Sequence, residues 1–171
     1  MLQIARFSLI WRVLALFGTF LAKIEDGQCS QEVMHSMTKG FARVLEDCKK
    51  EEHVGDHVMQ DFFNFWHEEY ELVNHELGCV VLCMAGKLEL IDDDMRMHHG
   101  NAKEYAKAHG ADDELAQKLV DMVHSCEQAS AAIEEKCARA LDTVKCFRTK
   151  IHGLKWAPSM RVIMEEVMAA G

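Results

Sequence analysis

Apolar residues recur along most of the chain at the i, i+3, i+4, i+7 spacing of one face of an α-helix. Four stripes have this spacing: Val33 to Cys48, Leu77 to Leu88, Leu115 to Cys126 and Cys137 to Ile151. Gly110 and Asp112 stand before the third stripe, as a helix stop and a candidate N-cap. No segment alternates apolar and polar residues as a half-buried β-strand does, so the sequence predicts an all-α fold.

A fifth stripe follows Pro158, the single proline of the chain. Its apolar members are Met160, Ile163, Met164, Val167 and Met168. Burying such side chains gains about 1.5 to 3 kcal/mol each, whereas ordering ~13 residues costs roughly 1.5 kcal/mol per residue. The two terms nearly cancel. Residues 159–171 are therefore predicted to form an amphipathic helix, and a small difference in free energy decides whether this helix docks on the rest of the domain.

The N-terminus has the layout of a secretory signal peptide. Arg6 and Arg12 precede an apolar run over residues 13–22, and a polar stretch then leads to Cys29. The run is much shorter than the roughly 20 residues of a membrane-spanning helix, although an uncleaved anchor is an alternative. We expect cleavage after residue 29, which leaves a single secreted domain over residues 30–171.

The expected mature domain is acidic. It keeps 16 basic and 26 acidic residues, a net charge of −10. Binding to nucleic acid or to anionic membranes depends on clustered lysine and arginine, so both are unexpected partners. No second candidate membrane span follows Ser30, and we expect no stable membrane insertion.

Cysteine number and placement indicate disulfides. Cleavage after Cys29 removes one of seven cysteines, and six can form three disulfides in an oxidising compartment. The CxxC pairs of structural zinc sites are missing, so no metal is expected. Cys79 and Cys83, one helical turn apart, can tie one helix to two neighbours, but 15 connectivities remain open. A domain stapled in this way can tolerate a hollow centre.

The cysteine spacing resembles that of the insect odorant-binding proteins. The six cysteines are separated by 30, 3, 42, 10 and 8 residues. The stretches "SQEVM", "DFFNFW", "HHGNAKEYAKAHGADDELAQKLVD" and "CFRTKIHGLKWAPSM" are similar to the lepidopteran pheromone-binding branch, whereas "DDDMRMHH" resembles the general odorant-binding branch.

This resemblance implies a compact bundle of about six helices around an apolar cavity. It also implies the disulfides Cys48–Cys83, Cys79–Cys137 and Cys126–Cys146. The family's function is to carry long-chain unsaturated alcohols, aldehydes or acetates through the sensillum lymph of the antennae to olfactory receptors, with receptor contact being indirect. A monomer or weak homodimer without cofactor or metal is expected.

The resemblance also assigns the ligand-binding residues. They are Met34, Met37, Thr38, Phe41, Phe65, Trp66, Val81, Ala85, Met97, Tyr105, Val120, Val123, Arg139 and Phe147. Relatives contact the ligand's oxygen through a serine or an asparagine at the positions of Ala85 and Leu82, which cannot hydrogen-bond here. Thr38, and Arg139 with Glu127, are therefore the expected polar contacts.

Relatives release their ligand at acid pH when the C-terminal helix enters the cavity. The resemblance implies a pH switch made of His98, His99 and His124 with Glu165 and Glu166. Histidine changes charge between about pH 5 and 8. The two glutamates would hold the tail outside at neutral pH. Two acidic positions of the relatives are Arg161 and Ala170 here, so a shallower switch is expected.

Two other classes of function fit the sequence less well than a carrier. The stretch "HEEYE", His67 to Glu71, lacks the second histidine of the zinc-protease motif HExxH, and no G-x-S-x-G elbow is present. We expect no catalysis, with a secreted lipid-acting enzyme as the enzymatic alternative. A membrane-active helical protein would need a cationic amphipathic helix. A general plant-odorant carrier of the same fold remains an open alternative.

The remaining histidines, including His35 and His152, are expected on the surface.

Overall fold

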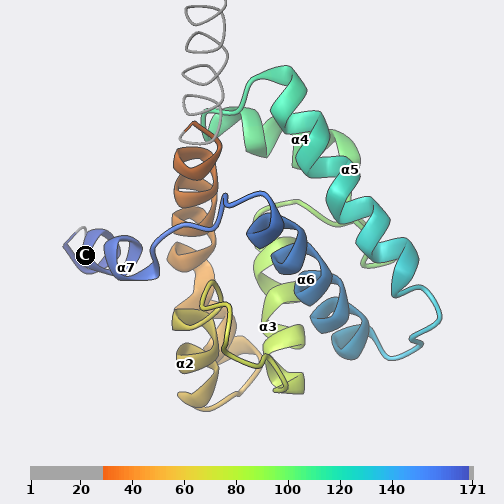
Figure 1. The fold of residues 1–171 in the computed structure, drawn as a ribbon. Helices are drawn as coiled ribbons and strands as arrows, with labels where there is room; N and C mark the ends of the chain where they lie inside the picture. Colours follow the sequence, from red (N-terminus) through yellow and green to blue (C-terminus); the bar gives the residue numbers. More distant parts are fainter. Residues whose placement is uncertain (1–28, 170–171) are drawn as a thin grey trace, which may run out of the picture.

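The computed structural model describes residues 29–169, apart from the side chains of Val167 and Met168, and these residues form a helical bundle (Figure 1). The first helix covers residues 29–51 of the described chain and is called the N-terminal helix. It is followed by α2 (His57–Phe63), α3 (His75–Lys87), α4 (His99–Ala108), α5 (Asp113–Ala129), α6 (Lys136–Gly153) and α7 (Met160–Ala169). The all-α prediction is confirmed.

The predicted signal peptide lies outside the described residues except for Cys29. This residue is exposed and belongs to no disulfide in the described chain. It is the cysteine that the predicted cleavage would remove. None of the described helices combines the length and the apolar character needed to cross a membrane.

Helix starts follow local capping chemistry. The side chain of Asp112 accepts a 2.8 Å hydrogen bond from the backbone N–H of Leu115, so the predicted N-cap of α5 is present. Asn74 caps α3 by accepting from the N–H of Glu76. His98 caps α4 by accepting from the N–H of Asn101. These caps satisfy backbone donors that a helix leaves unpaired at its first turn.

The core is centred on α3, which packs against α6, while α5 packs against both α6 and α4. Leu77, Val80 and Met84 of α3 are fully buried, as the second stripe predicted. Gly78 permits the close approach of α3 to α6, because a β-carbon at this position would overlap the carbonyl oxygen of Cys137. The stripe ends earlier than predicted, since Leu88 is the C-cap of α3 and lies outside the helix.

Three disulfides tie this core together. They join Cys48 to Cys83, Cys79 to Cys137 and Cys126 to Cys146, the pairs that the family resemblance implies. The N-terminal helix and α6 are thereby both linked to α3, and α5 is linked to α6. In the chain-entropy model, loops of 35, 58 and 20 residues make each bridge worth about 3 to 4 kcal/mol.

A buried arginine holds the segment between α2 and α3. The guanidinium of Arg148 donates hydrogen bonds to the carbonyl oxygens of Tyr70 and Glu68, at 2.8 and 2.9 Å, and to that of His67. Buried Asp61 accepts a 2.7 Å hydrogen bond from the Tyr70 hydroxyl. This segment is therefore fixed by polar contacts that satisfy its backbone without regular secondary structure.

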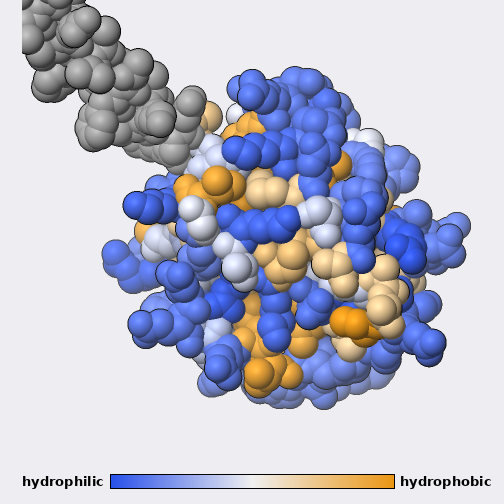
Figure 2. Space-filling view, turned by 45° about the vertical axis from the view of Figure 1, so that its right-hand side comes forward, coloured by the Kyte–Doolittle hydropathy of each residue, from blue (hydrophilic) through white to orange (hydrophobic). Residues whose placement is uncertain are grey.

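The C-terminal helix α7 lies on the outside of the N-terminal helix, away from α3 and α6 (Figure 1). Met160 and Ile163 are buried, with Ile163 fully inaccessible, so the apolar stripe of the tail is docked. Figure 2 shows a mostly hydrophilic surface with apolar atoms gathered in its central part. The acidic composition and the amphipathic helices together account for this distribution.

Candidate ligand-binding cavity

An apolar cavity of about 200 Å³ lies between the helices. Its apolar and aromatic wall consists of Met37 and Phe41 from the N-terminal helix, Val81, Leu82 and Ala85 from α3, Leu90, Ile91, Met95 and Met97 from the loop between α3 and α4, Ala102 and Tyr105 from α4, Val123 from α5, and Ala140, Val144 and Phe147 from α6. Five further lining residues are polar: Arg96, Glu127, Lys136, Arg139 and Thr143.

Nine of the fourteen residues expected to bind ligand line this cavity. They are Met37, Phe41, Val81, Ala85, Met97, Tyr105, Val123, Arg139 and Phe147. The other five, Met34, Thr38, Phe65, Trp66 and Val120, are not among the lining residues. Met34, Trp66 and Val120 are buried, and Phe65 packs edge-on against Trp66. Met34, Thr38, Phe65 and Trp66 contact one another in a packed layer, in which the Trp66 ring lies edge-on to the lining residue Phe147.

Thr38 was expected to contact the ligand's oxygen, but its hydroxyl is used inside that packed layer. It donates a 2.7 Å hydrogen bond to the carbonyl oxygen of Met34. It also accepts a 3.1 Å hydrogen bond from the indole N–H of Trp66. The hydroxyl proton is therefore committed, and Thr38 stabilises the position of the Trp66 ring.

Tyr105 presents its ring to the cavity and hides its polar end. Its hydroxyl donates a 3.0 Å hydrogen bond to the carbonyl oxygen of Met37, and burial raises the pKa of the phenol. Gly40 makes room for this contact, because a β-carbon there would overlap the Tyr105 hydroxyl. Tyr105 thus contributes an uncharged aromatic wall and ties α4 to the N-terminal helix.

The loop between α3 and α4 closes one side of the cavity. The Glu127 carboxylate of α5 accepts a 2.8 Å hydrogen bond from the N–H of Met97, and Ile91 forms an isolated antiparallel bridge with Met97. Asp92 accepts hydrogen bonds from the N–H groups of Asp94 and Arg96. These contacts hold the apolar loop residues against the cavity.

Two of the four charged lining residues lie toward the solvent, and the other two, Glu127 and Arg139, are half-buried and bonded to backbone groups. Arg96 and Lys136 are exposed, whereas Arg139 is half-buried and donates a 3.0 Å hydrogen bond to the carbonyl oxygen of Ile133. Charged groups at the rim stay hydrated, so the interior of the cavity remains apolar.

The three histidines of the expected pH switch adjoin this wall. His98 and His124 directly follow the lining residues Met97 and Val123. The Nε2 atom of His99 lies 3.1 Å from Nδ1 of His124, which joins α4 to α5. His98 is also the N-cap acceptor of α4, through its Nδ1 atom. Protonation of that nitrogen would remove the cap, and charging both paired rings would make them repel.

Glu166, the second expected switch element, holds α7 on the N-terminal helix. Its carboxylate lies 2.6 Å from Nζ of Lys39 and 3.2 Å from Nε2 of His35. The hydrogen bond from Lys39, followed by that from His35, lowers the pKa of Glu166. Glu165 is exposed and pairs with Arg161 on the same helix at 3.3 Å. None of the described α7 residues lines the cavity.

Several lining residues were not predicted. Leu90, Ile91, Met95 and Arg96 come from a loop, where helical periodicity gives no signal. Ala140 lies one turn before Val144 on the same face of α6, so the periodicity could have found it. Three expected surface histidines are partly buried: His109, and His35 and His152, whose side chains are 25% and 15% exposed.

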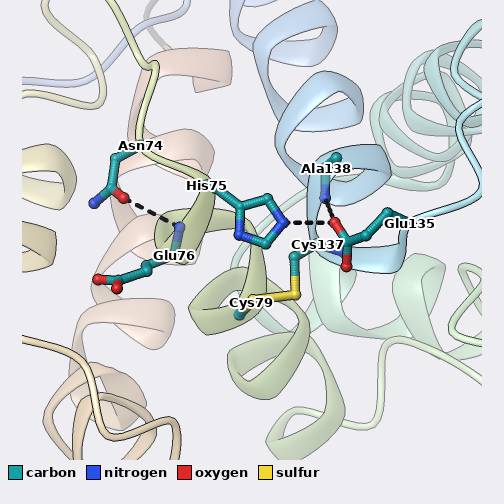
Figure 3. Close-up of a disulfide and its surroundings, with 7 residues drawn as sticks. All are labelled: Asn74, His75, Glu76, Cys79, Glu135, Cys137 and Ala138. Atoms are coloured by element: carbon teal, nitrogen blue, oxygen red, sulfur yellow. Dashed lines mark hydrogen bonds and ion pairs between the residues drawn. A yellow bond between two sulfur atoms is a disulfide. The ribbon is translucent and has the colours of Figure 1, made fainter.

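One cluster of possible metal ligands occurs within the described residues: His75, Glu135 and Cys137. Figure 3 shows why it suits a structural role. The sulfur of Cys137 is bonded to Cys79, so it offers no thiolate. The Glu135 carboxylate accepts hydrogen bonds from the N–H groups of Cys137 and Ala138, at 3.0 and 2.6 Å, and lies 2.6 Å from Nε2 of His75. Glu135 therefore caps α6 and links it to the start of α3.

Comparison with known proteins identifies the family. A model of the PBP/GOBP family matches residues 30–150. The chain belongs to this family. Pheromone-binding protein 2 of Epiphyas postvittana is 44% identical over 140 residues, which cover 82% of this chain and 85% of that protein. General odorant-binding protein 2 of Heliothis virescens is 36% identical over 137 residues, covering 80% and 84%.

The fold agrees with that of a solved family member. The crystal structure of Epiphyas postvittana pheromone binding protein 3 matches with a TM-score of 0.63 and 51% sequence identity. The match covers 68% of this chain and 99% of that chain. Relatives named for pheromones and for general odorants are thus both similar to this member of the PBP/GOBP family.

Proposed function

We propose that this protein is a secreted carrier that binds a hydrophobic odorant or pheromone in the cavity between the N-terminal helix and α3 to α6. The observation that carries the proposal is the apolar cavity of about 200 Å³ inside a frame tied by disulfides. Membership of the PBP/GOBP family supports it, and relatives named as binding proteins are consistent with a carrier rather than an enzyme.

The proposed ligands are long-chain unsaturated alcohols, aldehydes or acetates. A buried CH₂ group contributes about 0.8 kcal/mol, so a chain of about a dozen carbons can bind with micromolar or better affinity after association costs. The cavity is smaller than the roughly 300 to 1,000 Å³ of many small-molecule sites. Met37, Met95 and Met97 line it, and unbranched methionine side chains can rearrange to enlarge it.

Displacement of a bound fluorescent naphthylamine probe tests the carrier function. The titration would use the mature protein at pH 7 and a panel of alcohols, aldehydes and acetates of about 10 to 18 carbons. We expect saturable displacement with a stoichiometry of about one. A panel that leaves the probe in place, together with hydrolysis of an ester substrate, would favour the lipid-acting enzyme instead.

Secretion into the sensillum lymph, and transport to olfactory receptors, belong to the same proposal. The basic and apolar N-terminal residues support secretion, as does the position of the odd cysteine, Cys29, at the expected cleavage site. Mass spectrometry of the protein secreted by insect cells should find Ser30 as the first residue. A secreted product that retains Cys29 would contradict the predicted boundary.

We also propose that ligand is released at acid pH and that the histidines act before the tail. Protonation of His98 removes the cap of α4. Protonation of both His99 and His124 places two positive rings next to each other, with the Nε2 atom of His99 3.1 Å from Nδ1 of His124. Both events loosen α4, which supplies Ala102 and Tyr105 to the cavity wall.

The tail responds at lower pH because the pKa of Glu166 is lowered in the docked state. The contribution of the ionised Glu166 to the docking of α7 is complete above the ordinary pKa of 4.5, and it is lost only as the pH falls through the lowered pKa. Near pH 5 the carboxylate stays ionised, and a protonated His35 would strengthen the contact. The docked α7 is therefore proposed to resist mild acid, and tail entry into the cavity to follow only in stronger acid.

A further inference from the structure

Among the residues that the structure describes and buries, one polar side chain has no hydrogen-bond partner. Six polar or charged residues are buried among those the structure describes: Ser30, Thr38, Asp61, Ser130, Thr143 and Arg148. Thr38, Asp61, Ser130 and Arg148 make the hydrogen bonds that burial requires, and Ser30 is also engaged. The side chain of Thr143, a residue at 9% exposure, makes no hydrogen bond to any described residue. Its hydroxyl is therefore available.

This lack of a partner is unusual for a threonine in a helix, because the hydroxyl commonly bonds to the carbonyl oxygen of the preceding turn. Thr149, on the same helix α6, does so at 2.9 Å from the carbonyl oxygen of Lys145. Thr38 does the same with Met34. The hydroxyl of Thr143 makes no such bond to Arg139, four residues before it.

The Thr143 side chain lines the apolar cavity. The oxygen of Thr143 keeps some accessible surface. Among the described residues, the side-chain atom that is both inaccessible and without a hydrogen-bond partner is Nε2 of His152, not the Thr143 oxygen. Because Thr143 is buried and lines the cavity, we infer that this accessible oxygen faces the cavity. The lining residues Ala140, Val144 and Phe147 of α6 are apolar, and the guanidinium of Arg139, one turn before Thr143, is bonded to the carbonyl oxygen of Ile133.

We propose that Thr143 is the specificity-determining residue that hydrogen-bonds the uncharged oxygen of the ligand. This inference rests on the proposed carrier function and deepens it. A hydroxyl offers one donor and two acceptor lone pairs, so it can pair with an alcohol, an aldehyde or an ester carbonyl. It replaces the contact expected from Thr38, whose proton is committed to Met34.

The same geometry argues against a charged ligand head at this point. An ionised carboxylate taken into an apolar cavity needs a charged partner or several donors, and one hydroxyl is too little. Arg96 and Lys136 are exposed at the rim, where they remain hydrated, and the half-buried guanidinium of Arg139 is bonded to the carbonyl oxygen of Ile133. Thr143 therefore selects neutral oxygenated chains over hydrocarbons of equal length.

The test compares two ligands and three variants in the probe-displacement assay at pH 7. The ligands are a primary alcohol and the hydrocarbon of the same chain length and unsaturation. Thr143→Val removes the hydroxyl at nearly constant volume, and Thr143→Ser restores it. Thr149→Val is the matched control, because Thr149 is an exposed threonine of α6 outside the cavity.

For Thr143→Val we expect the Kd of the alcohol to rise by about 3- to 10-fold, which is the range of one net hydrogen bond. The Kd of the hydrocarbon should stay within about 2-fold of the unmodified protein, and Thr143→Ser should keep most of the alcohol affinity. Thr149→Val should change neither value. Thermal melting of each variant verifies that the fold is intact.

Equal weakening of the alcohol and the hydrocarbon in Thr143→Val would overturn the assignment, since it would reflect cavity shape. Unchanged affinity for both ligands would overturn it as well. In either case the unmodified protein still binds, and the carrier function stands. If neither ligand displaces the probe from the unmodified protein, the carrier function itself fails and the inference falls with it.

Discussion

Lys39 of the N-terminal helix donates a 2.6 Å hydrogen bond to Glu166 of α7, across 127 positions of the sequence. This contact, with His35 on the other carboxylate oxygen, keeps the C-terminal helix on the outer face of the bundle. The apolar residues Met160 and Ile163 dock on the same side. The position of the tail is thus set by one ionisable side chain together with a small apolar contact.

Glu166→Gln should loosen α7 at pH 7, because it removes the charge that faces Lys39 and His35. Hydrogen exchange followed by mass spectrometry should report faster exchange of the α7 amides. Glu165→Gln is the matched control, since Glu165 is exposed and contacts Arg161 of its own helix. Equal acceleration in both variants would indicate a general effect of helix charge and would contradict the specific contact.

The pH dependence of ligand affinity should depend on the His99 and His124 pair. His99→Gln removes one of the two rings that would repel each other when protonated, so we expect a smaller loss of affinity between pH 7 and pH 5 than in the unmodified protein. Probe displacement at both pH values measures it. His67→Gln, at an exposed histidine away from the cavity, is the control and should keep the full loss.

Truncation after Pro158 separates the histidines from the tail. Since Glu166 remains ionised at pH 5 in the docked state, the truncated protein should lose about as much affinity between pH 7 and pH 5 as the full chain. A truncated protein that keeps its affinity at pH 5 would show instead that the tail displaces the ligand in mild acid.

Gly78→Ala should destabilise the protein strongly. The added β-carbon would overlap the carbonyl oxygen of Cys137, and the adjacent disulfide, with its Cα atoms 4.6 Å apart, prevents α3 and α6 from separating. We expect a loss of about 1 to 3 kcal/mol in the free energy of unfolding, as for other overpacked cores. Urea denaturation monitored by circular dichroism measures the change.

Gly86→Ala is the control on the same helix. Its β-carbon would have Ile91 as its nearest neighbour, at 4.0 Å, and alanine is a better helix former than glycine. This variant should gain about 0.5 to 1 kcal/mol. A loss in Gly86→Ala similar to that in Gly78→Ala would contradict the explanation from close helix packing.

Stability in strong acid should depend on Glu135. Hydrogen bonds from the N–H groups of Cys137 and Ala138, and then from His75, lower the pKa of Glu135 to about 2. Because this pKa is lowered, the stabilisation of the fold by the ionised Glu135 is complete above the ordinary pKa of 4.5 and is lost as the pH falls toward 2. Glu135→Gln should therefore flatten the decline of the unfolding free energy between pH 4.5 and pH 2.

Urea denaturation at several pH values measures this decline. Glu134→Gln is the control, because Glu134 is exposed and precedes the cap. The prediction fails if Glu135→Gln and the unmodified protein lose stability in parallel over this range.

The long helices could be predicted from the sequence because each carries a regular apolar stripe. The positions of Leu77, Val80 and Met84 identify α3 as a buried element, and they are buried. The short helices α2 and α4 gave no such signal. Within α4 only Ala106 is buried, so the ten-residue helix has a narrow apolar face, and α2 has just seven residues. Their positions depend on tertiary packing rather than on local pattern.

The cavity was less predictable than the helices. Periodicity indicates which face of a helix points inward, but it does not separate a residue beside open space from one beside packed atoms. Trp66 and Phe147 are both inward-facing aromatic residues, yet only Phe147 lines the cavity. Thr143 was missed because a polar residue within an apolar stripe carries no signal until its hydrogen bonds are known.

The placement of the disulfides has a consequence for how a ligand could pass in and out. Cross-links join the N-terminal helix, α3, α5 and α6, whereas the sequences of α4 and of the loop before it contain no cysteine. That side of the wall is held only by hydrogen bonds and packing, such as Glu127 with Met97 and Tyr105 with Met37. Opening of this side would leave the covalent frame intact, so we expect that exchange of a ligand requires neither reduction nor unfolding.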